Sequence, residues 1–273
     1  MVRRLMWIVL GLLAAALIAA AAGSRFYTDW LWFNALGYND LFTRSLAWLW
    51  GVRAGSWLFF SLVLSVNLWV MKPAVKQALM RFYHLGWRIK DWYLMAAACL
   101  ASGVLGLIYA SGFGSYYFTI AQFFNASEFG VADPVFGKDI GFYFFKLPAY
   151  QLLISALATT LFVVTVICTA GYFLSGHFRL EGYRIKVTTA AQRHLSLLIG
   201  LLIFAKAAAY RLQTYQLLYN AGGVVFGAGY TDVNVRLLVL HVLSVLAAVT
   251  GLVLITRMYR FRRVLIGVLF LWF

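Results

Sequence analysis

The chain has 273 residues, of which 64% are hydrophobic and 11% are charged. A soluble domain carries about 25% charged residues, so this composition excludes an ordinary water-soluble fold and indicates a membrane protein. The formal net charge of +15 would suggest nucleic-acid binding in a soluble protein. Here the basic residues lie in short segments between apolar runs, where they set membrane topology. We therefore expect an all-α, polytopic helical bundle that has the lipid bilayer as its partner and binds no nucleic acid.

The first apolar run covers residues 5–23 and contains no charged residue. About 19 residues at about 1.5 Å each just cross a hydrocarbon core of about 30 Å. The alternative is a cleaved signal peptide, because Ala20–Ala22 resembles a small-residue cleavage site. The aromatic, amphipathic segment 24–45 predicts a short helix that lies in the membrane interface.

Further apolar runs predict a bundle of about seven spans, interrupted by longer polar segments. The second span should end before Pro73, because proline disfavours helix at the residue that precedes it. Residues 111–150 form the longest predicted loop. The last ten residues cover only about half a bilayer, so we expect a single transmembrane domain over 1–273, followed by an extracytoplasmic region after residue 273. The predicted spans are 5–23, 48–70, 92–110, 152–174, 195–212, 237–256 and, incomplete, 264–273.

Lys and Arg alternate in number between successive loops. The loops after the second, fourth and sixth spans hold five, four and four of these residues. Each of the other three loops holds two, when Arg211 at the end of the fifth span is counted with the loop that follows it. Cytoplasmic loops are the Lys- and Arg-rich ones. This predicts a multi-pass protein of the bacterial cytoplasmic membrane with a cytoplasmic N-terminus, whose cytoplasmic loops contact anionic lipid headgroups.

Lys206 is the first candidate functional residue. It lies about eleven residues into its predicted span, at a depth of roughly 16 Å. A charge there is costly and usually faces a partner or water, which would suit a substrate, ion or proton site. The alternative is a lysine whose side chain extends toward the outer headgroups, near Tyr210 and Arg211.

The remaining candidates lie in the two longer outer loops. Asp133 and Asp139 lie six residues apart and could approach one cation, but Asp133-Pro134 and the glycine before Lys138 also read as turns. Tyr230 and Asp232 belong to a glycine-rich segment, and Asp232 or Thr231 could cap the following helix. A glycine-rich loop at a helix N-terminus can bind an anion, although Asp232 would repel one.

Catalytic motifs are missing from the sequence. It contains no HExxH, no GxSxG and no dinucleotide-binding glycine pattern, so we assign no catalytic, cofactor-binding or metal-binding residue. His84, His177 and His194 lie in or beside predicted cytoplasmic loops. Cys99 and Cys168 fall within apolar runs and are expected to be buried, structural thiols.

Four stretches of the chain resemble uncharacterised protein family 0182, a group of bacterial membrane proteins with no established activity. The resemblance covers most of the chain from about residue 26 onward, and it implies about seven spans followed by a large extracytoplasmic region. It brings no known catalytic residue. The stretches are WFNALGY (32–38), DPVFGKDIGFYFFKLPAY (133–150), TYQLLYN (214–220) and VVFGAGYTDVNVRL (224–237).

Three functions stay open at this point. The favoured one is a membrane scaffold that anchors its own extracytoplasmic region. The second is a transporter or channel with a site near Lys206. The third is an enzyme that acts on an envelope or lipid-linked substrate at the outer face, which would depend on the outer aspartates. The scaffold explains the lack of acidic and histidine clusters in the predicted spans, and on balance we expect no enzymatic activity.

Overall fold

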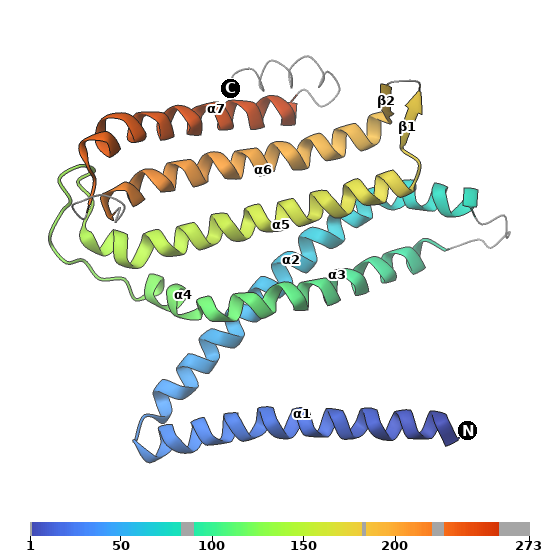
Figure 1. The fold of residues 1–273 in the computed structure, drawn as a ribbon, viewed down its shortest axis with the longest axis horizontal. Coiled ribbons are helices and arrows are strands. Elements are labelled where there is room, and N and C mark those ends of the chain that lie inside the picture. The colour runs from blue at the N-terminus through green and yellow to red at the C-terminus, as the bar shows by residue number, and fades with distance from the viewer. Residues whose placement is uncertain (1, 83–89, 182–183, 220–226, 257–273) are drawn as a thin grey trace.

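The computed structural model describes residues 2–82, 90–181, 184–219 and 227–256. Long helices dominate this part of the chain (Figure 1). They are α1 (Val2–Ala35), α2 (Asn39–Phe82), α3 (Asp91–Phe113), α4 (Tyr117–Phe124), α5 (Leu147–Leu174), α6 (Thr189–Gln216) and α7 (Leu237–Thr256). Shorter elements extend them: the 3₁₀ turns η1 (Gly114–Tyr116) and η3 (Leu217–Tyr219), and the π-helical turns η2 (Phe142–Lys146) and η4 (Asp232–Arg236).

Within the described residues, five helical segments are long and apolar enough to cross a membrane. They begin with α2, α3, η2, α6 and η4, and each contains one of the predicted spans. The predicted first span lies within α1, which is not one of these five, and the predicted span 264–273 lies outside the described residues. The helical membrane-type fold is confirmed, and the count of seven spans is not.

Helices α5, α6 and α7 lie side by side in that order, while α2 crosses α3 and also packs on α5 (Figure 1). Helix α1 lies apart from this bundle and meets α2 near the turn that joins them. We call the end of the bundle that holds this turn, α4 and the α6–α7 connection the loop end. The opposite end, which holds the strands β1 (Phe178–Glu181) and β2 (Arg184–Val187), is the hairpin end.

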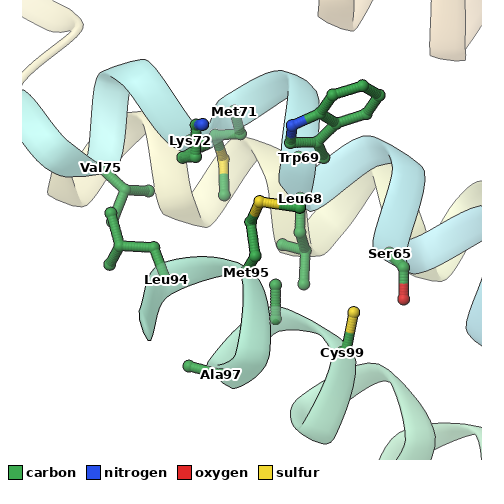
Figure 2. A pocket seen from close by; sticks show the side chains of 11 residues that line it. Ser65, Leu68, Trp69, Met71, Lys72, Val75, Leu94, Met95, Ala97 and Cys99 are labelled. Carbon is green, nitrogen blue, oxygen red and sulfur yellow. The ribbon is translucent and has the colours of Figure 1, made fainter. Parts of the chain in front are cut away.

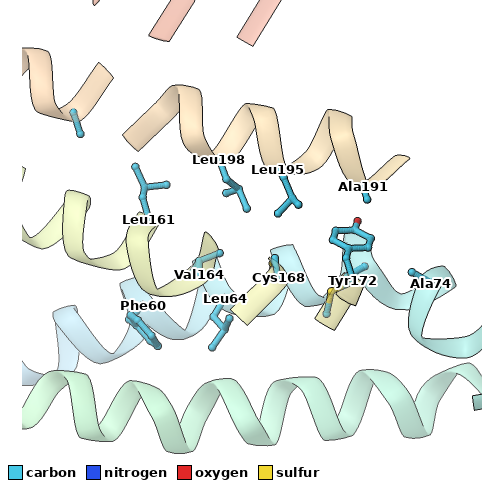
Figure 3. Close-up of a cluster of buried hydrophobic side chains, with 12 residues drawn as sticks. Phe60, Leu64, Ala74, Leu161, Val164, Cys168, Tyr172, Ala191, Leu195 and Leu198 are labelled. Atoms are coloured by element: carbon cyan, nitrogen blue, oxygen red, sulfur yellow. The ribbon is translucent and has the colours of Figure 1, made fainter. Parts of the chain in front are cut away.

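The core is a cluster of buried side chains where α2, α5 and α6 meet (Figure 3). Leu64, Val164 and Cys168 are completely buried there. Their helices contribute positions three, four or seven residues apart, which lie on one helical face. Cys168 is therefore buried as predicted, whereas the prediction for Cys99 is wrong, because its thiol is exposed on α3.

Two local predictions are wrong. Segment 24–45 is no separate interfacial helix: it forms the end of α1, a tight turn at Gly37 with φ +76°, and the start of α2. Helix α2 also continues through Pro73. Proline removes one backbone hydrogen bond, but the flanking Met71 and Ala74 are buried in the core, and this packing keeps the helix intact.

Two predicted loops contain regular structure. Most of 111–150 is helical, and the non-helical part is 125–139. Residues 140 and 141 begin the helical turn that leads into α5. The predicted basic loop 175–194 includes the antiparallel pair β1–β2, in which Arg179 lies opposite Lys186. Four-residue strands with alternating charge give little periodic signal, and this explains why the sequence did not indicate them.

Candidate functional site

The loop end holds four of the five predicted site residues, and Asp133 organises the first part of it. Its carboxylate accepts backbone N–H groups from Val135 (2.9 Å), Phe136 (2.6 Å) and Lys138 (2.8 Å), and the hydroxyl of Tyr143 (2.7 Å). This is the turn chemistry of an aspartate before proline. Burial raises the pKa of Asp133, but the hydrogen bonds outweigh burial and hold the pKa below its ordinary value.

Asp139 closes the same loop from its other end. Its carboxylate accepts the N–H groups of Phe129 (3.0 Å), Gly130 (2.8 Å) and Gly141 (2.6 Å). These hydrogen bonds, the one from Phe129 first, hold the pKa of Asp139 below its ordinary value against a smaller effect of desolvation. A Cβ at Gly141 would lie 2.3 Å from the Ser127 carbonyl oxygen, so this close approach requires glycine.

The folded loop packs against α6 through aromatic rings. Tyr215 of α6 meets Phe136, Phe142 and Tyr143 at centroid distances of 4.9, 5.2 and 6.4 Å. We call residues 125–143 the loop platform. Several of its apolar side chains are exposed, namely Phe129, Val131, Val135 and Ile140. The platform is therefore a fixed backbone that presents apolar side chains outward.

Asp232 lies in the first turn of the helical segment that leads into α7. Its carboxylate accepts the N–H of Gly229 (3.1 Å) and pairs with Arg236 (2.9 Å), and its side chain is 11% exposed. An acid at a helix N-terminus is favoured by the helix dipole. Tyr230, two residues earlier, is 83% exposed. Asp232 thus has a structural role in starting the helix.

Lys206 lies on an exposed position of α6. Its Nζ is 5.0 Å from the ring centroid of Tyr210, one turn nearer the loop end. A cation over an aromatic face is stabilised by the ring quadrupole. This geometry matches a lysine that extends along its helix, and the cavities described below are lined by other residues.

The predicted residues do not converge on one reactive centre. Asp133 and Asp139 share a loop, but each carboxylate is occupied by neighbouring donors, and Asp232 serves a different connection. In the described part of the chain, no group of three or more His, Cys, Asp or Glu residues could hold a metal ion.

Sequence reasoning missed an open cavity between α6 and α7 at the loop end, with polar side chains in a largely apolar lining. Its volume is about 390 Å³, and Gln213, Gln216 and Arg236 contribute its polar lining beside Leu217, Val239 and Leu240. In the sequence, the signal for this cavity is the pair of glutamines, Gln213 and Gln216, near the end of an apolar run. Amide and guanidinium groups here could hydrogen-bond a polar ligand.

A buried polar network near the hairpin end was also missed. His194 of α6 lies 2.8 Å from Asn67 Oδ1 through Nε2 and 3.1 Å from the Tyr172 hydroxyl through Nδ1. Because Asn67 donates its amide to the Val63 carbonyl, its Oδ1 must accept from Nε2–H, and Nδ1 then accepts from Tyr172. The network joins α2, α5 and α6, whereas the sequence placed His194 in or beside a loop.

This architecture defines a class: an α-helical protein with at least five segments able to cross a membrane and a fixed, apolar-tipped loop at one end. The chain belongs to the uncharacterised protein family UPF0182, whose model matches residues 6–273. The resemblance seen in the sequence is thereby confirmed.

Relatives of the chain occur in several bacteria. It is similar to UPF0182 proteins of Desulforamulus reducens (34% identical, 93% of this chain, 30% of the relative) and Moorella thermoacetica (31%, 94% and 29%). It is also similar to the UPF0182 protein of Mycobacterium marinum (36%, 90% and 26%). The chain thus spans less than a third of the length of these relatives. No solved structure matches it.

Proposed function

We propose that this chain is a membrane scaffold that anchors an extracytoplasmic polypeptide and holds it on the loop platform. The observation that carries the proposal is the platform itself, a loop whose backbone is fixed by two carboxylates while its apolar side chains face outward. Exposed apolar residues on a rigid loop are typical of a docking surface. The greater length of the relatives supports the proposal, because they have polypeptide beyond the region matched here.

The proposed sidedness places the hairpin end in the cytoplasm and the loop end outside, in the bacterial cytoplasmic membrane. The loops predicted to be cytoplasmic and described here gather at one end of the bundle, together with the start of α1 (Figure 1). Reporter fusions test this sidedness. A fluorescent protein joined after Val187 should fluoresce, and alkaline phosphatase joined after Gly130 should be active. The reverse pattern would show the opposite orientation in the membrane.

The transporter and enzyme alternatives have weaker support. A transport site at Lys206 needs a water-accessible cavity, but this lysine lies on the outside of α6 over Tyr210. An outer-face enzyme needs a free carboxylate, but Asp133 and Asp139 each accept at least three hydrogen bonds from their own loop. Both arrangements favour a structural role for these residues.

Charge substitutions on the platform test the scaffold proposal. Val131→Asp combined with Ile140→Asp adds two charges to the exposed apolar side chains without changing the carboxylate contacts. In the full-length native protein, proteolysis first cuts any covalent link between this region and the extracytoplasmic polypeptide. We expect the amount of that polypeptide that co-purifies to fall at least tenfold in the double variant. Leu36→Asp combined with Tyr38→Asp, which adds two charges at exposed positions of the α1–α2 turn at the same end, is the matched control. Equal retention in the platform variant and the wild type would contradict the proposal.

A further inference from the structure

A slot lies between the parts of α2 and α3 that are nearer the hairpin end (Figure 2). Its volume is about 230 Å³. Its walls are mainly apolar, with Lys72 at one end and the Ser65 hydroxyl toward the other. Met71 and Met95 project into the same region from the two helices, and Cys99 lies at the other end.

On the side of the slot nearer the loop end, the backbones of the two helices are in close contact. There the Trp57 indole donates to the Gly103 carbonyl (2.9 Å) and Ser61 donates to the Ser102 carbonyl (3.1 Å). A Cβ at Gly106 would meet the Ser61 hydroxyl, so glycine permits this approach. The helices cross here (Figure 1), and the slot lies between them beyond the crossing.

The end of the slot is cationic. Lys72 Nζ lies 2.9 Å from the Asp91 carboxylate, which Lys76 also contacts. Lys90, which precedes Asp91, is exposed. Three lysines and one aspartate leave two net positive charges at this end, and the Asp91 side chain is 49% exposed. An anion can therefore approach the lysines from solvent.

We propose that this slot is a binding site for one anionic phospholipid of the leaflet at the hairpin end. The phosphate contacts Lys72 and Lys76, and one acyl chain lies in the slot. Cys99 follows Asp91 by eight residues, or about 12 Å of helix, which is close to the roughly 15 Å of one hydrocarbon leaflet. The lining methionines are unbranched and adapt to a flexible chain. The inference requires only that α2 and α3 cross a bilayer, so it stands independently of the scaffold role.

Two substitutions separate the two halves of the proposed site. Ala98→Phe fills the slot from its wall without changing charge, because Ala98 lines it. Lys72→Gln removes one cation while Asp91 keeps its contact with Lys76. Arg179→Gln is the matched control, since it removes one exposed cation from the same end of the molecule, on β1.

The experiment measures lipid retention by native mass spectrometry after the delipidated full chain is titrated with phosphatidylglycerol or phosphatidylcholine. We expect one phosphatidylglycerol to bind in preference to phosphatidylcholine. Ala98→Phe should abolish this preferred binding, and Lys72→Gln should weaken it about fivefold, as expected for one lysine at the membrane surface. Arg179→Gln should bind as the wild type does. Thermal melting identifies any variant that does not fold.

A second readout uses the exposed Cys99 thiol, since Cys168 is completely buried. Phosphatidylglycerol should slow the reaction of Cys99 with an apolar maleimide, and phosphatidylcholine at the same concentration should slow it less. Unchanged phosphatidylglycerol retention in folded Ala98→Phe would overturn the proposal. Equal losses in Lys72→Gln and Arg179→Gln would also overturn it, because binding would then follow total charge.

Discussion

At the residue scale, two carboxylates hold the irregular backbone of the loop platform in place. Asp133 and Asp139 together accept six backbone N–H groups, and Asp133 also accepts the Tyr143 hydroxyl. Fifteen residues outside helices, 125–139, would otherwise leave many backbone donors unsatisfied. The ionised carboxylate is the better acceptor, so the loop depends on its charge.

Asp133→Asn tests this dependence. The amide keeps one acceptor oxygen but places an NH₂ group where the carboxylate met Lys138 N–H and Tyr143. We expect a loss of about 1 kcal/mol of local stability, measured as faster hydrogen exchange over 125–143. Glu128→Gln, an exposed acid in the same loop, serves as the control. Equal exchange in the two variants would contradict the role of Asp133.

The platform should also loosen in acid. The pKa values of Asp133 and Asp139 are depressed in the folded loop, so their contribution is fully present above the unfolded pKa near 3.9. It is lost as the pH falls from there through the folded pKa values. Pepsin cleavage within 125–141, divided at each pH by the rate on an unstructured peptide of the same sequence, should therefore be slow at pH 5 and rise steeply below about pH 4. A cleavage rate that stays flat across this range would exclude this electrostatic role.

The buried network predicts a measurable effect of one hydroxyl. Tyr172→Phe removes the donor to His194 Nδ1 while preserving ring packing. Hydrogen bonds between membrane helices contribute about 0.6 kcal/mol on average and up to about 1.7 kcal/mol, and we expect a loss within this range. Unfolding of the protein in detergent measures it, with the exposed Tyr93→Phe as the control. A change in the free energy of unfolding no larger than that of the control would show that the network does not stabilise the protein.

At the element scale, close helix contacts depend on glycine at defined positions. A Cβ at Gly251 of α7 would lie 2.7 Å from the Gly200 carbonyl oxygen on α6. Backbone cannot yield as a flexible side chain does, so the two helices would have to separate. The α6–α7 pair also carries the Ser244 hydrogen bond to the Ala207 carbonyl (3.0 Å).

Gly251→Ala should therefore destabilise the α6–α7 pair by about 1–3 kcal/mol, the usual cost of overpacking. Gly55→Ala is the matched control, because a Cβ at Gly55 meets open space. The midpoint of thermal unfolding in detergent micelles compares the two variants. Similar midpoints for both would show that α6 and α7 are packed less closely than described.

The sequence predicted the apolar helices well, because long uncharged runs leave few alternatives. It predicted their ends poorly. Pro73 lies inside α2 because buried neighbours outweigh its lost hydrogen bond. The loop predicted over 111–150, with turns at both aspartates, is longer than the non-helical stretch 125–139. Its packing against Tyr215 could not be anticipated. Contacts between rings far apart in the chain leave no local pattern.

At the scale of the whole molecule, the described bundle has a polar, cationic end and an end that carries the loop platform. The buried network of Asn67, Tyr172 and His194 lies toward the hairpin end, while the cavity beside Arg236 lies at the loop end. This separation suits the proposed arrangement, in which the helices between the two ends cross the membrane and the loop end presents a docking surface. The length of its bacterial relatives supports the same interpretation.

Photo-crosslinking from the platform tests the scaffold role most directly. Benzoylphenylalanine at Val131, an exposed platform position, is compared with the same residue at Leu58, which is exposed on α2 within its apolar stretch. In native cells we expect Val131 to form an adduct with an extracytoplasmic polypeptide, either a further part of the same chain or a separate subunit. Leu58 should yield no such adduct. Adducts from Val131 with lipid alone, or with cytoplasmic proteins, would contradict the proposed function.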